Sequence, residues 1–396
     1  MKVMKIIDGR ENQRMRGSIL RRASPGIIEL MRFASSLVLL LLVPLAGAQW
    51  RHAEAVDASV EAYRLRYRVA GLSVGIMKGG RQIYARGFGF ADEARSQKAD
   101  ERTLYRLASV SKPITGILAM SLVQSGRLDL DWDVRRLLPE LPSHHSYALR
   151  ALLDHRSGVR HYVDSDPIPA LNRKFEWARD VIPYLAKDPL VMQPGTGERY
   201  STHAYTLFAA AMERAKGEPF REFADRSFAR WGLTALRNET MSPRAARSEV
   251  YTLVGERRVA GGRDDTSWKS AGGGMESDVL DLCRLGHLLV TGRVLRKETV
   301  QQMWARQRPD DESGRSNGWV KSSFQGKRTV GHSGSQLGAN SYWLIFPDED
   351  VVVAVLTNTS GNNPQLLARY LARAAFLSED EVLAPLELPP PSGRAR

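Results

Sequence analysis

The sequence predicts an α+β protein whose antiparallel sheet is built from both ends of the chain. Near the start, two apolar runs flank a Gly-Gly turn and predict a hairpin, at 72–77 and 82–85. Four strand-like runs follow near the other end, at 319–324, 327–331, 341–346 and 351–358. Helical stretches dominate between them, without an internal repeat or a Ser/Gly-rich linker. Strands at both ends with helices between them favour one unit with an inserted helical region.

Residues 1–48 are expected to lie outside this unit, as an upstream extension and signal peptide. Arg32 precedes the apolar run Phe33–Val43, and the small residues Ala46-Gly47-Ala48 follow it. This order is typical of a secretory signal, and the run is short for a membrane span of about 20 residues. We expect cleavage after Ala48, translation from Met31 to suffice, and an exported, periplasmic or secreted protein. The alternative is a retained membrane anchor, which would be the only contact with a membrane.

The net charge of +13 does not indicate a nucleic-acid partner. Residues 1–48 carry eight Lys/Arg and three acidic residues, which leaves +8 on residues 49–396. No run of five or six basic residues occurs, so nucleic-acid binding is not expected. Cys283, the only cysteine, excludes an intrachain disulfide and is expected to be a small buried hydrophobe.

Helices are predicted in chain order from periodic apolar residues and from glycines placed where helices end. They cover 56–68, 109–125, a helix ending at Gly158, 205–216, one capped by Ser277 or Asp278, and 364–377. The stretch 87–92 is expected to leave the sheet. The proline-rich residues 385–396 predict a disordered end. The expected domain is therefore 55–378, followed by a tail at 379–396.

The stretch Ser109-Val110-Ser111-Lys112 is the strongest candidate for chemistry. Residues at i and i+3 share a helix face, so Ser109 and Lys112 are expected to be neighbours. A helix start offers free N–H groups and a partial positive charge, which suit an oxyanion. A buried lysine can lose its proton near neutral pH and accept one from a serine hydroxyl. The alternative is a capping serine followed by a surface lysine.

Two later motifs offer further groups. Tyr200-Ser201-Thr202 follows a turn-rich loop, and Tyr200 is either a proton shuttle or a packed aromatic. His332-Ser333-Gly334 precedes the closing strands, where a glycine allows close approach of the backbone. We expect the N–H of Ser335 to face that of Ser109, while His332 by itself is more often a structural histidine.

No metal or other cofactor is expected. Several histidines and aspartates crowd one stretch, at 144, 145, 155, 161, 164 and 166. Their spacing fits no tight metal-binding pattern.

Taken in order, the three motifs resemble those of the serine β-lactamase-like and penicillin-binding superfamily, and more narrowly its class C-related, peptidase S12-like members. The resemblance spans roughly residues 55–378 and implies a β-lactamase/transpeptidase-like fold. It implies that Ser109 is the acylated nucleophile, Lys112 its activating partner and Tyr200 the general base and proton shuttle.

The resemblance also implies the substrate-binding residues. Thr202 and Gly334 would line the substrate site, and the N–H groups of Ser109 and Ser335 would form the oxyanion hole. His332 would stand where many members carry a lysine that meets the substrate carboxylate.

Two departures bear on the activity. Thr202 replaces the usual asparagine and cannot offer an amide donor and acceptor together, and His332 replaces lysine. The Tyr-Ser-Thr ending also occurs in the mitochondrial serine β-lactamase-like branch. The sequence therefore predicts an exported serine hydrolase that cleaves a peptide, amide or ester through an acyl-enzyme. The alternatives are a true β-lactamase and a catalytically silent scaffold, and the sequence indicates no oligomeric state.

Overall fold

The computed structural model describes residues 50–171, 173–305, 314–378 and 380–389. The predicted signal segment at 33–48 lies outside these residues, as does the whole stretch before it. The unit described below lies within His52–Arg396.

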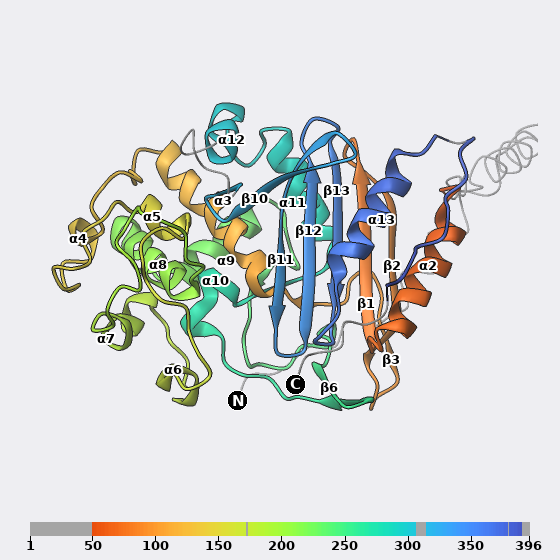
Figure 1. Cartoon of the computed structure of the whole chain (residues 1–396), viewed down its shortest axis with the longest axis horizontal. Coiled ribbons are helices and arrows are strands. Elements are labelled where there is room, and N and C mark those ends of the chain that lie inside the picture. Colours follow the sequence, from red (N-terminus) through yellow and green to blue (C-terminus); the bar gives the residue numbers. More distant parts are fainter. Residues whose placement is uncertain (1–49, 172, 306–313, 379, 390–396) are drawn as a thin grey trace, which may run out of the picture. The chain divides into compact units, whose positions relative to one another are not determined.

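The centre of this unit is an eight-stranded antiparallel sheet in the order β3-β2-β1-β13-β12-β11-β10-β9 (Figure 1). Its strands are β1 (Gly71–Lys78), β2 (Arg81–Asp92), β3 (Gln97–Lys98), β9 (Arg315–Ser316), β10 (Trp319–Phe324), β11 (Lys327–Gln336), β12 (Ala339–Phe346) and β13 (Val351–Thr357). β1 pairs with β13, with Leu72 opposite Thr357. This pairing confirms the prediction of a sheet assembled from both ends of the chain.

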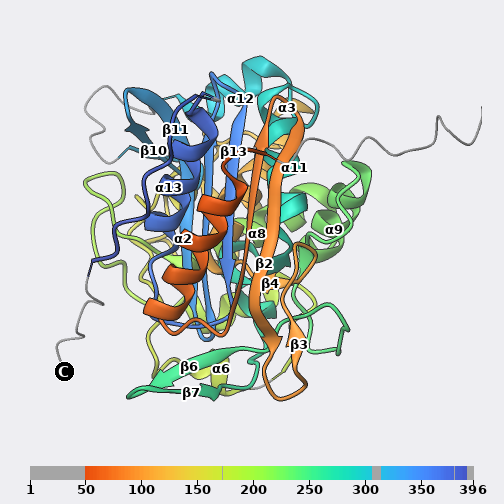
Figure 2. The ribbon, with the colours of Figure 1, turned by 90° about the vertical axis from the view of Figure 1, so that its right-hand side faces the viewer.

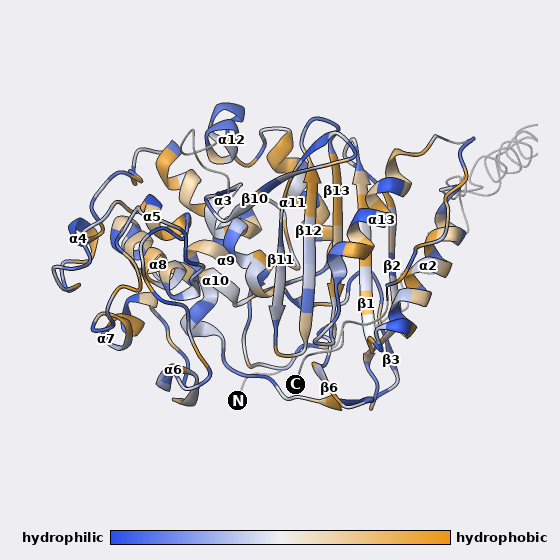
Figure 3. Ribbon diagram, viewed as in Figure 1, coloured by the Kyte–Doolittle hydropathy of each residue, from blue (hydrophilic) through white to orange (hydrophobic). Residues whose placement is uncertain are grey.

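Helices cover both faces of the sheet. α2 (Ala53–Arg66) and α13 (Pro364–Phe376) lie on one face, and α11 (Val279–Val290) packs against β1 and β13 on the other (Figure 2). Every residue of β13, Val-Val-Val-Ala-Val-Leu-Thr, is buried, and the strand is coloured as hydrophobic in Figure 3. A strand covered on both faces needs such a continuous apolar run. Cys283 of α11 is buried here, as predicted.

The inserted region between β2 and β9 is mainly helical. Its longer elements are α3 (Ser111–Gln124), α8 (Thr202–Lys216), α9 (Phe220–Arg230), α11 and α12 (Lys297–Trp304). Single turns make up the rest: α4 (Val134–Leu137), α5 (Arg150–Leu153), α6 (Pro167–Ala170), α7 (Ile182–Leu185), α10 (Ser270–Gly273) and the 3-10 turns η1 (Ala108–Val110), η2 (Ala178–Val181) and η3 (Ser267–Lys269). Two small sheets join them, β4 (Tyr105–Arg106) with β8 (Met275–Ser277) and β5 (Arg237–Asn238), and β6 (Tyr251–Val254) with β7 (Arg257–Ala260).

The helix ends agree with local signals. Gly217 follows α8 with a φ of +77°, and the side chain of Asp278 accepts a hydrogen bond from the N–H of Asp281 at the start of α11. Glycine is favoured where a helix ends in the left-handed region, and aspartate where a helix begins. In the described part of the chain, no helix is both long and apolar enough to cross a membrane.

Three expectations were wrong. Residues 87–92 stay in the sheet as part of β2, where a Cβ at Gly87 would lie 2.4 Å from the carbonyl oxygen of Ala99. Only glycine lets the strand pass so close to that backbone. The helix expected to end at Gly158 ends at Leu153 instead.

The third error concerns the proline-rich end. Residues 385–396 were expected to be disordered, yet 385–389, like the residues from 380 on, run along α2, while 390–396 lie outside the described residues. Leu383 is buried, the N–H of Leu386 donates to Oγ of Ser59, and the hydroxyl of Tyr67 donates to the carbonyl of Pro389. Contacts with another element, which the composition does not reveal, order this segment.

Candidate active site

Ser109 is presented by the tight turn η1, directly before α3. From residue 103 to residue 112 it is the only residue that is not buried. The preceding Ala108 has a φ of +48°, which is uncommon for a residue other than glycine. Such strain clusters at functional sites, where the surroundings hold it in place. Here the N–H of Leu107 donates to the carbonyl of Met275, and Ser341 Oγ donates to the carbonyl of Leu107.

Lys112 lies one turn further on, with Nζ 3.2 Å from Oγ of Ser109. Nζ also lies 3.0 Å from Oγ1 of Thr202 and 2.6 Å from the carbonyl oxygen of Gly272. The side chain is fully buried, and burial lowers the pKa of the Lys112 amine well below its usual range. These hydrogen-bond partners are two hydroxyls and one carbonyl, none of which stabilises a positive charge as a carboxylate would.

A neutral amine fits this surrounding. It has two N–H donors and one lone pair. The carbonyl of Gly272 and the hydroxyl of Thr202 can take the two donors, which leaves the lone pair for the hydroxyl proton of Ser109. The arrangement therefore suits Lys112 as an acceptor of the serine proton.

Tyr200 also contacts this serine. Its hydroxyl donates to Oγ of Ser109 over 2.7 Å, and its ring centroid lies 4.7 Å from Nζ of Lys112. Burial raises the pKa of Tyr200 to about 12, against the opposing effects of the Ser109 hydrogen bond and the charge of Arg315. At neutral pH the side chain is thus an uncharged phenol that can donate and relay a proton. A phenolate general base, which the resemblance implies, is not favoured in this state.

Two histidines hold the tyrosine motif in place. The N–H of Ser201 donates to Nδ1 of His155 over 3.0 Å, and the N–H of Thr202 donates to Nδ1 of His161 over 3.1 Å. The ring of His155 also packs on Tyr200 with centroids 4.4 Å apart. Burial lowers the pKa of His161 to about 4, so this ring is neutral and can accept a hydrogen bond.

The sequence reasoning missed this supporting role. It treated His155 and His161 only as possible metal ligands. The available signal for a supporting role was that these histidines crowd the stretch before the motif Tyr200-Ser201-Thr202. Within residues 50–389, as far as they are described, no group of three His, Cys, Asp or Glu side chains could hold a metal ion.

The predicted substrate-binding residues have varied surroundings. Thr202 is buried, and its hydroxyl accepts a hydrogen bond from Lys112, so it supports the lysine. His332 is buried with its ring centroid 6.3 Å from that of Tyr200. Burial lowers the pKa of His332 to about 3. A neutral ring cannot supply the positive charge that the resemblance assigned to this position.

Gly334 and Ser335 lie on β11, which continues to Gln336 past its expected end at residue 331. A Cβ at Gly334 would lie 2.3 Å from the carbonyl oxygen of Leu107 and 3.1 Å from Cβ of Ala108. Gly334 therefore lets β11 pack directly on the turn that presents Ser109. Ser335, the next residue, is exposed and pairs with Asn340 of β12.

Comparisons with known proteins agree with this geometry. A model of the Beta-lactamase family matches residues 53–377. The chain is 26% identical over 384 residues to the serine beta-lactamase-like protein LACTB, mitochondrial, of Mus musculus, an alignment that covers 70% of each protein.

Two solved structures share the fold. The octameric penicillin-binding protein homologue from Pyrococcus abyssi aligns with a TM-score of 0.72 at 23% identity and covers 82% of this chain and 77% of that one. The D-amino acid amidase from Ochrobactrum anthropi SV3 aligns with a TM-score of 0.68 at 21% identity and covers 82% of this chain and 96% of that one. Because the family model spans the whole sheet and all three motifs, the chain belongs to the beta-lactamase family of serine hydrolases.

Proposed function

We propose that this chain cleaves an amide or ester bond through an acyl-enzyme on Ser109. The observation that carries the proposal is the arrangement around one oxygen atom. Oγ of Ser109 receives a hydrogen bond from the neutral hydroxyl of Tyr200 and lies 3.2 Å from the buried amine of Lys112. A proton donor and a proton acceptor thus flank the nucleophile, as acyl transfer requires.

The proposed reaction has two halves. As Oγ of Ser109 attacks the carbonyl carbon, its proton passes to Nζ of Lys112. When the tetrahedral intermediate collapses, the bond to the leaving nitrogen or oxygen breaks. Tyr200 donates its hydroxyl proton to that atom and regains a proton from Lys112, which becomes neutral again. Water then attacks the carbonyl carbon of the acyl-enzyme and gives a proton to Lys112, and as the bond from that carbon to Oγ breaks, Oγ takes up a proton through the same groups.

The oxyanion hole is assigned to the N–H groups of Ser109 and Ser335. The close packing of Gly334 on Leu107 and Ala108 supports this assignment because it places β11 against the turn η1. Two converging N–H donors stabilise the charge that develops on the carbonyl oxygen.

A peptidase, amidase or esterase is favoured over a dedicated β-lactamase. His332 is neutral, and Thr202 is engaged with Lys112, so neither position supplies the group that the resemblance led us to expect there. We therefore expect slow turnover of cephalosporins relative to esters or peptides.

The test is a substrate panel for the purified protein and its Ser109→Ala variant. The panel contains a D-Ala-D-Ala peptide, a short-chain p-nitrophenyl ester and a chromogenic cephalosporin. We expect turnover of the ester or the peptide to exceed that of the cephalosporin and to vanish in the variant. Efficient cephalosporin hydrolysis would favour the β-lactamase alternative, and hydrolysis that survives in Ser109→Ala would reject the assignment of the nucleophile.

We also propose that the protein is exported and that residues 1–48 are removed. The support is the order of basic, apolar and small residues at 32–48. N-terminal sequencing of protein recovered outside the cytoplasm tests this. A first residue of Gln49 is expected, and a chain that still carries residues 33–48 would indicate an anchor.

A further inference from the structure

Arg106 is a buried arginine on β4, three residues before Ser109. Its side chain is only 1% exposed, and Nε pairs with Glu239 at 3.0 Å while Nη2 lies 2.8 Å from Oδ1 of Asp264. A charge in the interior is costly unless it is paired and hydrogen-bonded. The two carboxylates offset that cost and fix the direction of the guanidinium group.

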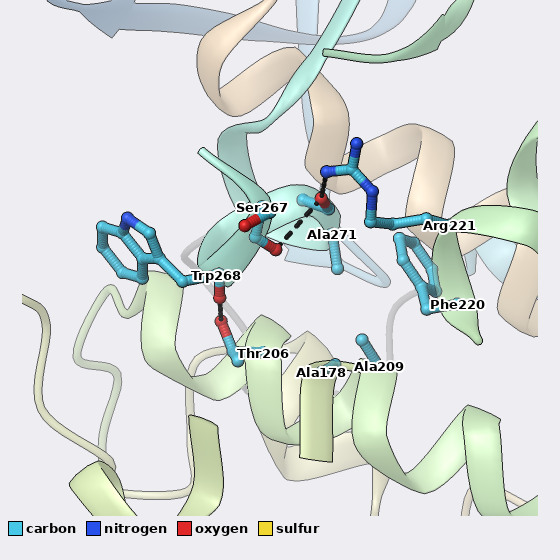
Figure 4. Close-up of a pocket in the computed structure, with 9 residues that line it drawn as sticks. Ala178, Thr206, Ala209, Phe220, Arg221, Ser267, Trp268 and Ala271 are labelled. Carbon is cyan, nitrogen blue, oxygen red and sulfur yellow. Dashed lines mark hydrogen bonds between the residues drawn. The ribbon is translucent and has the colours of Figure 1, made fainter. Parts of the chain in front are cut away.

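The main partner of Arg106, Glu239, is itself held from several sides. Its N–H donates to the carbonyl of Gly274 over 2.8 Å, and its own carbonyl accepts a hydrogen bond from Nη2 of Arg221 over 2.8 Å. Nη1 of Arg221 donates to Oγ of Ser270, on the turn that runs from η3 into α10 (Figure 4). Arg106 therefore pairs with a carboxylate whose backbone is anchored to that turn.

The guanidinium group of Arg106 also binds the chain at the end of β11. Nη1 donates to the carbonyl of Leu337 over 3.2 Å. In the amide orientation that satisfies both of its neighbours, Gln336 accepts a hydrogen bond from Nε of Arg106 and donates one to the carbonyl of Gly273, each over 3.0 Å. The two residues bound by Arg106 directly follow Ser335 in the sequence.

Arg106 and Ser335 thus belong to two elements that meet at the nucleophile. β4 leads into the turn η1, which presents Ser109, and β11 packs on that turn through Gly334. A Cβ at Gly334 would lie 2.3 Å from the carbonyl oxygen of Leu107, so this contact sets how near β11 can come. The directed hydrogen bonds from Arg106 set where the end of the strand lies once it is in contact.

We propose that Arg106 is a positioning residue of the oxyanion hole. Through its bonds to Gln336 and Leu337, it sets the N–H of Ser335 against the N–H of Ser109. The proposal rests on the proposed function, because it assumes an acyl-enzyme on Ser109. Two donors stabilise an oxyanion only when they converge on the place it occupies, and a displacement of about 1 Å can cost about 10²-fold in rate.

A pair of substrates measures the oxyanion hole separately from the rest of the site. The pair is p-nitrophenyl butyrate and its thiono analogue, in which sulfur replaces the carbonyl oxygen. Sulfur is larger than oxygen and a weaker hydrogen-bond acceptor, so the analogue gains little from the two N–H donors. The ratio of kcat for the ester to kcat for the analogue therefore reports the geometry of the hole.

Three variants change the contacts of Arg106, and a fourth is the matched control. Arg106→Met removes all of its donors, Gln336→Met removes only the bonds of the Gln336 side chain, and Gln336→Glu keeps the acceptor for Arg106. The control is Arg247→Met. Arg247 is a buried arginine that pairs with Glu276 at 2.6 Å and donates to the carbonyls of Thr240 and Ser242 rather than to β11.

We expect Arg106→Met to lower kcat for the ester by about 10–100-fold with little change in KM. This loss is smaller than the about 10²–10³-fold that follows removal of a whole oxyanion donor. The analogue should lose far less, so the ratio should fall. Gln336→Met should lower the ratio in the same direction, and Gln336→Glu should recover part of it. Arg247→Met should keep the wild-type ratio even where its melting temperature drops.

Equal losses on the ester and the analogue in Arg106→Met would overturn the proposal, because they would show a general loss of structure. A ratio that Arg247→Met lowers as strongly would also overturn it. Melting temperatures show which variants are folded. If Arg106→Met is not, the comparison of Gln336→Met with Gln336→Glu decides, and equal ratios in these two variants would count against the proposal.

Hydrogen exchange distinguishes failure of this proposal from failure of the proposed function. If the wild type hydrolyses neither compound, exchange of the backbone amides at 332–340 is compared by mass spectrometry between wild type, Gln336→Met and Arg247→Met. Faster exchange in Gln336→Met alone would support the positioning of β11 by Arg106 while the hydrolase function fails. Unchanged exchange, or an equal rise in Arg247→Met, would overturn the positioning role.

Discussion

The hydroxyl of Tyr200 donates a hydrogen bond to Oγ of Ser109 across a sequence separation of 91 residues. Burial keeps this phenol protonated, so the serine oxygen accepts from Tyr200 and its own proton is free to point elsewhere. The lone pair of a neutral Lys112 lies in reach. The proton order Tyr200 to Ser109 to Lys112 follows from these contacts.

Replacement of Ser109 by alanine is expected to abolish labelling by a serine-directed phosphonate. Mass spectrometry of the wild type should place the label on Ser109. The matched control is Ser111→Ala, because Ser111 is buried and its Oγ accepts a hydrogen bond from the N–H of Met275. That control should keep the label and lose about 1 kcal/mol of stability. A label on any residue other than Ser109 would contradict the assignment.

Replacement of Lys112 by methionine is expected to slow acylation by about 10²–10⁴-fold, the range for loss of a positioned proton acceptor. The pH dependence carries a second signature. Wild-type kcat/KM should fall at low pH as Lys112 takes up a proton, at a pKa well below its usual range. It should fall again only toward pH 12, where Tyr200 loses its proton. A low-pH limb that persists unchanged in Lys112→Met would assign that limb to another group.

Replacement of Tyr200 by phenylalanine keeps the ring and removes only the hydroxyl. The packing on His155 should survive, so the melting temperature should change little. Turnover should fall by about 10²-fold or more because the proton route to the leaving group is lost. Stopped-flow kinetics measure the acylation step, and steady-state kinetics measure the turnover of the whole reaction. Unaltered turnover would show that the leaving group is protonated from elsewhere.

Replacement of His161 by phenylalanine tests the support of the tyrosine motif. The ring contacts with Tyr162 and Tyr200 can remain, whereas the N–H of Thr202 loses its acceptor. We expect a loss of about 1–3 kcal/mol, seen as a lower midpoint in urea unfolding, together with slower turnover. The exposed His144, changed to phenylalanine, is the control and should stay near wild type. Equal stability of the two variants would dismiss the His161 hydrogen bond as a support.

Replacement of Gly334 by alanine is expected to displace Ser109, although the new methyl group does not contact Ser109 itself. The new Cβ would meet the carbonyl oxygen of Leu107 at 2.3 Å, so β11 or the turn η1 must shift. Such overpacking costs about 1–3 kcal/mol, and phosphonate labelling should slow. The control is Gly197→Ala. Its new Cβ would meet only Sδ of Met192, at 3.5 Å, so this substitution should be tolerated. Normal labelling in Gly334→Ala would show that this packing does not position Ser109.

The parts that could be predicted from the sequence depend on local geometry. The contact between Ser109 and Lys112 needs only a helical turn, and the strands at both ends follow from short apolar runs. The roles of His332 and Thr202 were less accessible because they depend on burial and on partners distant in sequence. The sequence around His332 does not indicate that the imidazole is neutral, because its charge state depends on burial by the elements packed around it. The same holds for residues 380–389, which are ordered by α2.

The pairing of β1 with β13 has a consequence for biosynthesis. Ser109 and Lys112 are translated early, yet the central strand pair closes only when Val351–Thr357 has been made. Until then β1 has an open edge where β13 will pair, and such edges invite association with other chains. A chain that terminates early, anywhere before Val351, would carry the nucleophile and its lysine without a closed sheet to hold them. Each molecule therefore becomes competent only after Val351–Thr357 has been synthesised.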